Sequence, residues 1–253
     1  MNFERLRAWG GAILSLTFMA AIAPVFVLAR ALLGRRFCAE RLGPWAAGVI
    51  LGIFGITVVA QFNLPLPERR AVYVSNHSSA VDMLVLLQLG LPRSRFFMKR
   101  GAWIVPPLAI IAICVGTFFT VPQKYTEKRR ILFARACKKL QKTGDSVYLS
   151  PEGTRVTTGA VGPFNKGAFH LAAELRAPMV PLYIEVPRTD NTGKSWLMKR
   201  TVVYVHQLPE VDTSEFRPDT ARKHADDVRR IFQSFEANLL AQKQVAQQQR
   251  AAA

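Results

Sequence analysis

Residues 71–89 read AVYVSNHSSAVDMLVLLQL, and this stretch decides the fold. The apolar run Ala71–Ser75 is typical of a buried strand, and Ser79–Leu89 has the pattern of a helix. His77 and Asp82 lie at this junction, five residues apart. A carboxylate on the first helical turn can hold the imidazole of a histidine that takes a proton from a hydroxyl. Taken alone, a capping or core histidine is the simpler interpretation; a second polar cluster downstream favours a candidate general base.

The chain from Arg70 onward continues this alternation of strands and helices, which is typical of α/β proteins. We expect further strands at Ser94–Met98, Thr117–Val121, Ser146–Leu149, Met179–Glu185 and Thr201–His206. We expect further helices at Thr126–Lys142, Lys166–Leu175 and Pro218–Gln242, and a short apolar helix around Pro106-Pro107. The pattern predicts an α/β domain over residues 65–241, with a mixed sheet flanked by helices. A Gln- and Ala-rich tail over residues 242–253 is predicted to be flexible.

Two uncharged runs, Ala8–Ala29 and Leu42–Pro67, come before this domain, and each is long enough to cross a bilayer. The basic segment Arg30–Arg41 joins them. We therefore expect residues 1–64 to form a two-helix membrane hairpin. A hairpin that enters one leaflet and returns is favoured over two full spans, because it keeps the arginines of the loop off the far side.

The composition favours a basic protein at a membrane. Lys and Arg number 34 against 17 Asp and Glu, a net charge of +17, and 50% of residues are hydrophobic. The charge favours an anionic partner, and the long uncharged runs favour an anionic membrane surface over nucleic acid. The three cysteines, Cys38, Cys114 and Cys137, have no metal-binding spacing, so we predict no metal and a reducing compartment.

The second polar cluster, Ser150–Arg155, follows the predicted strand Ser146–Leu149 and reads SPEGTR. In open α/β sheets, ligands bind beyond the carboxyl ends of strands, so this cluster and His77 can face one crevice. Gly153 permits a sharp turn, and Arg155 offers a planar fork suited to phosphate. The alternative is a tight turn in which Glu152 forms a surface salt bridge.

Together the two clusters resemble those of the glycerolipid acyltransferases of the 1-acyl-glycerol-3-phosphate acyltransferase type. Asn76, His77 and Asp82 match the family motif Asn-His-x-x-x-x-Asp, and Pro151–Arg155 matches Pro-Glu-Gly-Thr-Arg. Shorter similarities occur in the family's order at Met98-Lys99, Phe164–Gly167 and Val180–Leu182. The resemblance covers residues 65–210, and the N-terminal hairpin also fits the family.

This resemblance implies transfer of a fatty acyl group from an acyl-CoA or acyl carrier protein thioester to the free hydroxyl of a lysophospholipid. The expected acceptor is 1-acyl-glycerol-3-phosphate, the expected product is phosphatidic acid, and no cofactor is expected. His77 would act as base with Asp82 as its partner. The residues expected to bind substrate are Asn76, Lys99, Glu152, Gly153, Thr154, Arg155 and Lys166. The resemblance also implies an inner (cytoplasmic) membrane location, with the catalytic domain facing the cytoplasm.

One departure from the family concerns the acceptor. Pro122 stands where the second motif of the family usually has an arginine thought to help hold the acceptor's phosphate. Lys124 is a candidate substitute, but an ammonium lacks the guanidinium fork. Another lysolipid, such as lyso-ornithine lipid or one with a larger head group, therefore stays open. More remote alternatives are an esterase using Ser78 or Ser79, without the usual Gly-x-Ser-x-Gly elbow, and a non-enzymatic basic membrane-binding module.

The remaining histidines and the tryptophans carry weaker signals. His170, His206 and His224 have no carboxylate at a telling spacing, so we expect structural roles for them. Trp9 and Trp45 begin the two apolar runs, where an interfacial belt would place them. For Trp103, contact with lipid and a place in the core are equally consistent with the sequence.

Overall fold

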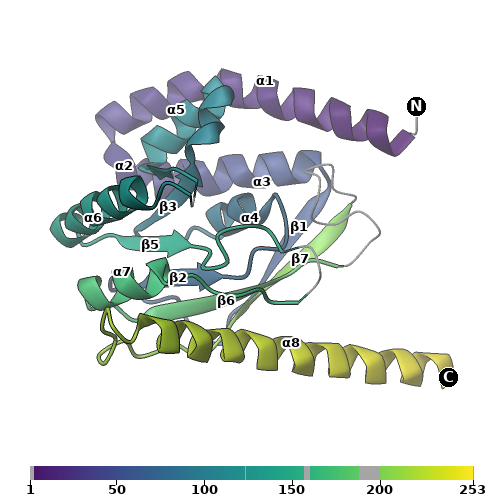
Figure 1. The fold of residues 1–253 in the computed structure, drawn as a ribbon. Helices are drawn as coiled ribbons and strands as arrows, with labels where there is room; N and C mark the ends of the chain where they lie inside the picture. The colour runs from purple at the N-terminus through teal and green to yellow at the C-terminus, as the bar shows by residue number, and fades with distance from the viewer. Residues whose placement is uncertain (1–2, 123, 157–159, 188–199, 253) are drawn as a thin grey trace.

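The computed structural model describes residues 3–122, 124–156, 160–187 and 200–252 (Figure 1). Within these ranges, seven strands form one sheet in the order β1-β7-β6-β2-β5-β3-β4. The strands are β1 Ile56–Gln61, β2 Val72–Ser75, β3 Ser94–Lys99, β4 Phe118–Thr120, β5 Ser146–Leu149, β6 Met179–Glu185 and β7 Thr201–Gln207. Strands β6, β2, β5, β3 and β4 run parallel, whereas β7 is antiparallel to β6 and pairs in parallel with β1. The prediction of an α/β mixed sheet flanked by helices is confirmed.

Helices cover both faces of the sheet (Figure 1). The helices α6 Thr126–Thr143, α7 Gly167–Leu175 and α8 Ala221–Ala252 pack on one face and share a core with β2, β5 and β6. The helices α3 Gly43–Ile53 and α4 Asp82–Gln88 pack on the other face around a second core. Helix α8 runs to Ala252, so the predicted helix end at Gln242 is wrong. Gln and Ala are both good helix formers, which explains why the helix continues.

The structure has one long apolar helix near the N-terminus, and not the clear two-helix membrane hairpin that the sequence predicts. Helix α1 Phe3–Leu32 is the single helix of the described residues that is long and apolar enough to cross a membrane. It is followed by α2 Gly34–Phe37 and a π-helical turn, η1 Cys38–Leu42. Helix α3 has 11 residues, too few for a span that needs about 20. It packs against α4 as part of the domain instead.

The second uncharged run misled the prediction because it contains a helix and a strand of the domain, α3 and β1, rather than one membrane helix. Gly55, with φ of +71°, turns the chain between α3 and β1. A Cβ atom at this position would lie 2.5 Å from the side chain of Arg200, so the close approach also favours glycine. The β-branched residues that follow form β1, which pairs with β7. The sheet therefore begins at Ile56, ahead of the predicted domain boundary at residue 65.

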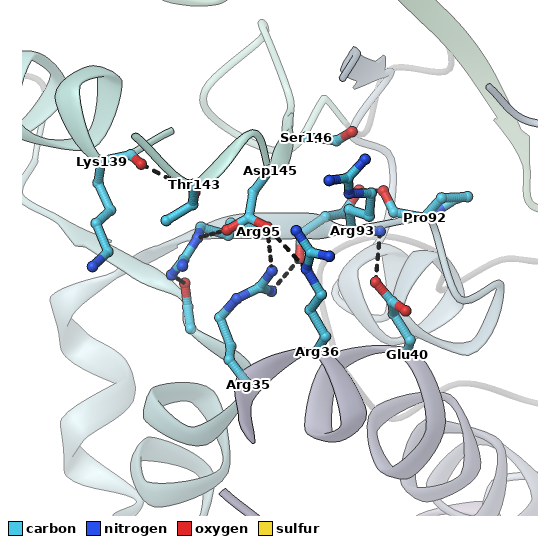
Figure 2. Close-up of polar contacts among 12 residues, drawn as sticks. Arg35, Arg36, Glu40, Pro92, Arg93, Arg95, Lys139, Thr143, Asp145 and Ser146 are labelled. Carbon is cyan, nitrogen blue, oxygen red and sulfur yellow. Dashed lines mark hydrogen bonds and ion pairs between the residues drawn. The ribbon is translucent and has the colours of Figure 1, made fainter. Parts of the chain in front are cut away.

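A buried ion cluster fixes the segment after α1 to the sheet (Figure 2). The Arg35 guanidinium donates to Asp145 Oδ1 at 2.6 Å, and Arg95 Nε donates to Asp145 Oδ2 at 2.8 Å. Arg35 also donates to the carbonyls of Ser94 and Val115. Burial raises the pKa of Asp145, but the hydrogen bonds and neighbouring arginines outweigh it and lower that pKa overall. The basic segment after α1 therefore lies against the domain, not on the far side of a membrane.

Candidate active site

The two polar clusters predicted from the sequence meet at one edge of the sheet. Strands β2, β5 and β3 are parallel neighbours, so their carboxyl ends lie side by side. His77 follows β2, Glu152 follows β5, and Lys99 ends β3. The main chain joins the first two clusters directly, because the Val156 N–H donates to the His77 carbonyl at 2.8 Å. This link places Arg155 beside the histidine loop.

His77 and Asp82 form the contact that their spacing indicates. Nδ1 of His77 lies 2.8 Å from Oδ2 of Asp82. The Asp82 side chain is 1% exposed, whereas the His77 side chain is 30% exposed. An ionised carboxylate only accepts hydrogen bonds, so Nδ1 carries the proton and Nε2 keeps a lone pair. The arrangement gives a base whose ring is oriented from inside and whose second nitrogen can accept a proton.

The Asp82 carboxylate also organises the turn that leads into α4. Its Oδ2 accepts the N–H groups of Ser78 and Ser79, both at 2.9 Å. The helix begins at Asp82 rather than at the predicted Ser79, and the Ser79 hydroxyl accepts the Val81 N–H. Among the described residues, Asp82 Oδ1 has no hydrogen-bond partner, although it is buried. Asp82 therefore supports the loop and the imidazole through one oxygen.

Asn76 ties the histidine loop to the neighbouring strand β6. Its Nδ2 donates to the Ile184 carbonyl at 2.9 Å, and its Oδ1 accepts the Ile184 N–H at 2.7 Å. The residue is 6% exposed. The side-chain amide thus mimics a strand partner at the end of β2, which fixes the direction in which the chain enters His77.

Glu152 holds the histidine loop from the opposite side. Its Oε2 accepts the His77 N–H at 2.5 Å, and its Oε1 accepts the Gly162 N–H at 2.6 Å. The residue is 5% exposed, so these bonds are shielded from water. Burial raises the pKa of Glu152, and the two backbone N–H groups oppose that shift. Both carboxylate oxygens therefore serve to join the His77 loop to the segment that follows the second cluster.

The remaining predicted binding residues surround this edge. Gly153 has φ of +70°, which permits the turn after Glu152. Thr154 and Arg155, next along the chain, are exposed. Lys99 and Lys166 are also exposed, Lys99 at the end of β3 and Lys166 at the N-cap of α7. The structure thus brings the two predicted clusters together. The cations Lys99, Arg155 and Lys166 lie exposed around them, at the rim of the candidate site.

Several contacts at the site could not be found from sequence patterns. The partners of Asn76 and Glu152 are main-chain groups of Ile184 and Gly162, which have no distinctive side chains. His206, for which no carboxylate was expected, lies 2.8 Å from Glu185 Oε2 across the β6–β7 pair. In the described part of the chain, no group of three or more His, Cys, Asp or Glu residues is placed to hold a metal ion.

The fold and the site define an α/β protein with a candidate general base at one edge of a mixed sheet and an apolar helix at its N-terminus. The family model described as Acyltransferase matches residues 55–185. This chain belongs to that acyltransferase family.

Proteins similar in sequence to this chain include several 1-acyl-sn-glycerol-3-phosphate acyltransferases. A Brassica napus chloroplastic 1-acyl-sn-glycerol-3-phosphate acyltransferase, BAT2, is 37% identical over 139 residues, 54% of this chain and 39% of that protein. The human beta form is 33% identical over 147 residues, 58% of this chain and 52% of that protein. The aligned part thus spans about half the length of these relatives, or less. The crystal structure of the 1-acyl-sn-glycerophosphate (LPA) acyltransferase PlsC from Thermotoga maritima matches the fold. Its TM-score is 0.72 at 21% identity, with 94% of this chain and 98% of that chain covered.

Proposed function

We propose that this protein transfers a fatty acyl group from an acyl-CoA or acyl carrier protein thioester to the free hydroxyl of 1-acyl-glycerol-3-phosphate, giving phosphatidic acid. The contact between His77 Nδ1 and Asp82 Oδ2 is the observation that carries this proposal. The family and the names of the similar proteins support the same reaction.

The reaction needs a base and no protein nucleophile. A lysolipid hydroxyl is a poor nucleophile near neutral pH, whereas a thioester carbonyl is already activated. Nε2 of His77 takes the hydroxyl proton as the oxygen attacks the carbonyl carbon, and Asp82 stabilises the imidazolium. The carbon–sulfur bond then breaks, and the imidazolium returns the proton to the leaving thiolate. General-base assistance of this kind contributes about 100- to 10,000-fold.

Charge at the rim supports binding of a phosphorylated acceptor. Arg155, Lys99 and Lys166 are exposed near the carboxyl edge and carry the positive charge that a phosphate requires. The oxyanion of the tetrahedral intermediate needs N–H donors as well. The N–H groups of Ser78 and Gly153 donate within the protein, to Asp82 and to the Ser150 carbonyl, so other donors must serve.

Membrane association belongs to the same proposal. Helix α1 has the length and composition of a membrane helix, and the chain carries a net charge of +17. These features support attachment to an anionic membrane surface. We place the protein at the inner (cytoplasmic) membrane with the catalytic domain facing the cytoplasm.

The identity of the acceptor is tested by supplying purified protein and a labelled acyl thioester with a panel of lysolipids. Transfer to 1-acyl-glycerol-3-phosphate is the expected result. Pro122, in place of the arginine usual in the family, favours a second candidate, a lysolipid without a phosphate monoester. Transfer only to such a lysolipid would establish this second candidate. No transfer to any lysolipid would leave a basic membrane-binding module.

Glu152→Gln tests whether Glu152 positions the histidine loop or binds the acceptor. The amide would turn an N–H donor toward one of the two backbone N–H groups, so we expect the loop to shift. A small displacement of a catalytic group is costly, and we expect kcat to fall by about 10- to 100-fold with little change in the acceptor KM.

Glu236→Gln is the matched control for this variant. Glu236 accepts the Val161 N–H on the same loop and the Tyr183 hydroxyl, and within the described ranges it has no hydrogen bond to the His77 loop. We expect it to keep the wild-type kcat. A raised acceptor KM with an unchanged kcat in Glu152→Gln would instead assign Glu152 to substrate binding.

A further inference from the structure

The short helical turn between β3 and α5 exposes two large apolar side chains. This turn, η2 Arg100–Ile104, leads into the apolar helix α5 Pro106–Val115. Ile104 is 85% exposed, the largest value among the large hydrophobic side chains that the structure describes, and Trp103 is 52% exposed. The structure therefore leaves Trp103 out of the core, where the sequence admitted both lipid contact and core packing.

The η2 turn stands at the same edge of the sheet as His77. It begins directly after Lys99, the last residue of β3, and Lys99 is paired in register with Thr120 at the end of β4. The ring of Trp103 contacts the ring of Phe119 on β4, with centroids 5.5 Å apart. The turn is thus braced against the strand ends rather than carried on a long loop.

The exposed apolar surface continues from η2 onto α5 and α1. Ile110 and Ile113 of α5 are exposed, while Ile111 and Cys114 on its other side pack in a core with Phe26 of α1. Figure 1 shows α5 lying against α1 on the side of the molecule away from α8. Outward-facing apolar residues of α1 include Trp9, Ile13, Leu14, Val25 and Leu28. The turn is therefore connected through α5 to α1, the one helix of the described ranges that has the character of a membrane helix.

The charge around η2 fits an anionic surface. No Asp or Glu occurs between Asp82 and Glu127, whereas Arg93, Arg95, Lys99, Arg100 and Lys124 lie in that interval. Lys99 and Arg100, immediately before the apolar tip, are exposed. Tryptophan and an aliphatic residue beside Lys and Arg form the pattern of an element that lies at a membrane–water interface. An acidic protein would match the charges but not the apolar tip, so the observations favour lipid.

We propose that the η2 turn is a second membrane contact, in which Trp103 and Ile104 insert into the head-group region of an anionic bilayer beside the catalytic edge. Helix α1 attaches the chain to the membrane, and η2 sets the height of the catalytic edge above it. The head group of a lysolipid then has to move only a short distance out of the bilayer to reach His77. This last consequence rests on the proposed acyltransferase function, whereas the insertion itself does not.

Tryptophan fluorescence tests the insertion without any activity. The variant Trp9→Phe, Trp45→Phe, Trp196→Phe keeps Trp103 alone. It is reconstituted into vesicles of phosphatidylcholine and phosphatidylglycerol with brominated acyl chains. We expect strong quenching of Trp103 relative to vesicles with unbrominated lipids. A Trp103 emission that bromine does not quench would overturn the proposal.

Activity tests the role of the turn in presenting the acceptor. Burying an isoleucine contributes enough free energy that Ile104→Asp should lower turnover of a vesicle-borne lysolipid by about tenfold or more. Turnover of a short-chain monomeric lysolipid should stay near the wild-type value. Ile131→Asp, at an exposed isoleucine on α6, is the matched control and should change neither rate. Equal losses with both acceptors would assign Ile104 to the fold instead.

The fluorescence and activity experiments together distinguish a failure of this proposal from a failure of the proposed function. If the wild-type protein transferred no acyl group but Trp103 were quenched, the function would fail and the membrane contact would stand. If the wild-type protein were active but Trp103 were unquenched, only the membrane contact would fail.

Discussion

His77→Ala is expected to lower acyl transfer by about 1,000-fold or more, because it removes the proposed base for the acceptor proton. The imidazole is oriented by a buried carboxylate at 2.8 Å, and no other histidine was assigned to the site from the sequence. The measurement is the rate at which label from an acyl thioester enters phospholipid. The variant should bind anionic vesicles as well as the wild type does, as measured by vesicle flotation.

His224→Ala is the matched control for this variant. It removes an imidazole that is stacked on Phe216 with centroids 4.0 Å apart and is hydrogen-bonded to Thr220. Its transfer rate should stay close to the wild-type rate. If His77→Ala retained that rate too, His77 would not be the base and the protein would use another group in its place.

Asp145→Asn is expected to destabilise the protein by about 3–5 kcal/mol, because it leaves buried guanidinium groups without their counter-charge. Asp145 is 2% exposed and holds Arg35 and Arg95, which are 8% and 9% exposed as side chains. At the usual scaling for a chain of this size, the melting temperature should fall by about 6–20 °C. Thermal unfolding in detergent, followed by circular dichroism, measures the change.

Glu127→Gln is the control for the Asp145 variant. It breaks an exposed ion pair with Arg130 on α6, and such surface pairs contribute little to stability. Its melting temperature should not change. An unchanged melting temperature in Asp145→Asn as well would mean that the buried cluster does not stabilise the fold.

The pH dependence of unfolding gives a second measure of how much the same cluster contributes to stability. Burial raises the pKa of Asp145, but the hydrogen bond from Arg95 and the charges of Arg35 and Arg95 outweigh burial and lower that pKa in the folded protein. Its contribution to stability is therefore complete above the pKa of an unfolded aspartate, about 3.9, and is lost as the pH falls through the lowered value. The wild type and Asp145→Asn should converge in stability at the acidic end.

Local pattern was sufficient to predict most of the sheet and the central contact of the candidate site. The apolar runs that become β2, β5 and β6 are bounded by polar turns, so their limits could be read closely. The contact between His77 and Asp82 followed from their spacing across one strand–helix turn. These predictions succeeded because strand–turn–helix geometry is local and depends on few residues.

The remaining features depend on contacts between distant parts of the chain. Arg35 and Asp145 are separated by 110 residues, and nothing in the sequence pairs them. The uncharged run Leu42–Pro67 has the hydrophobicity of a membrane helix, but it forms α3, which packs against α4, and β1, which pairs with β7. A hydrophobic segment is expected to be removed from water. Hydrophobicity alone does not tell whether the segment packs in a protein core or inserts into a bilayer. The partners of Glu152 are backbone groups, which carry no signal in a sequence.

Thiol release tests most directly whether His77 activates the acceptor for attack on the thioester. Wild-type protein and His77→Ala are given the same acyl thioester, with and without 1-acyl-glycerol-3-phosphate, and free thiol is followed in time. We expect the wild type to release thiol only when the acceptor is present. With the acceptor, His77→Ala should release thiol at least about 1,000-fold more slowly than the wild type. A stoichiometric burst of thiol from the wild type without acceptor, or an unimpaired His77→Ala, would contradict the mechanism.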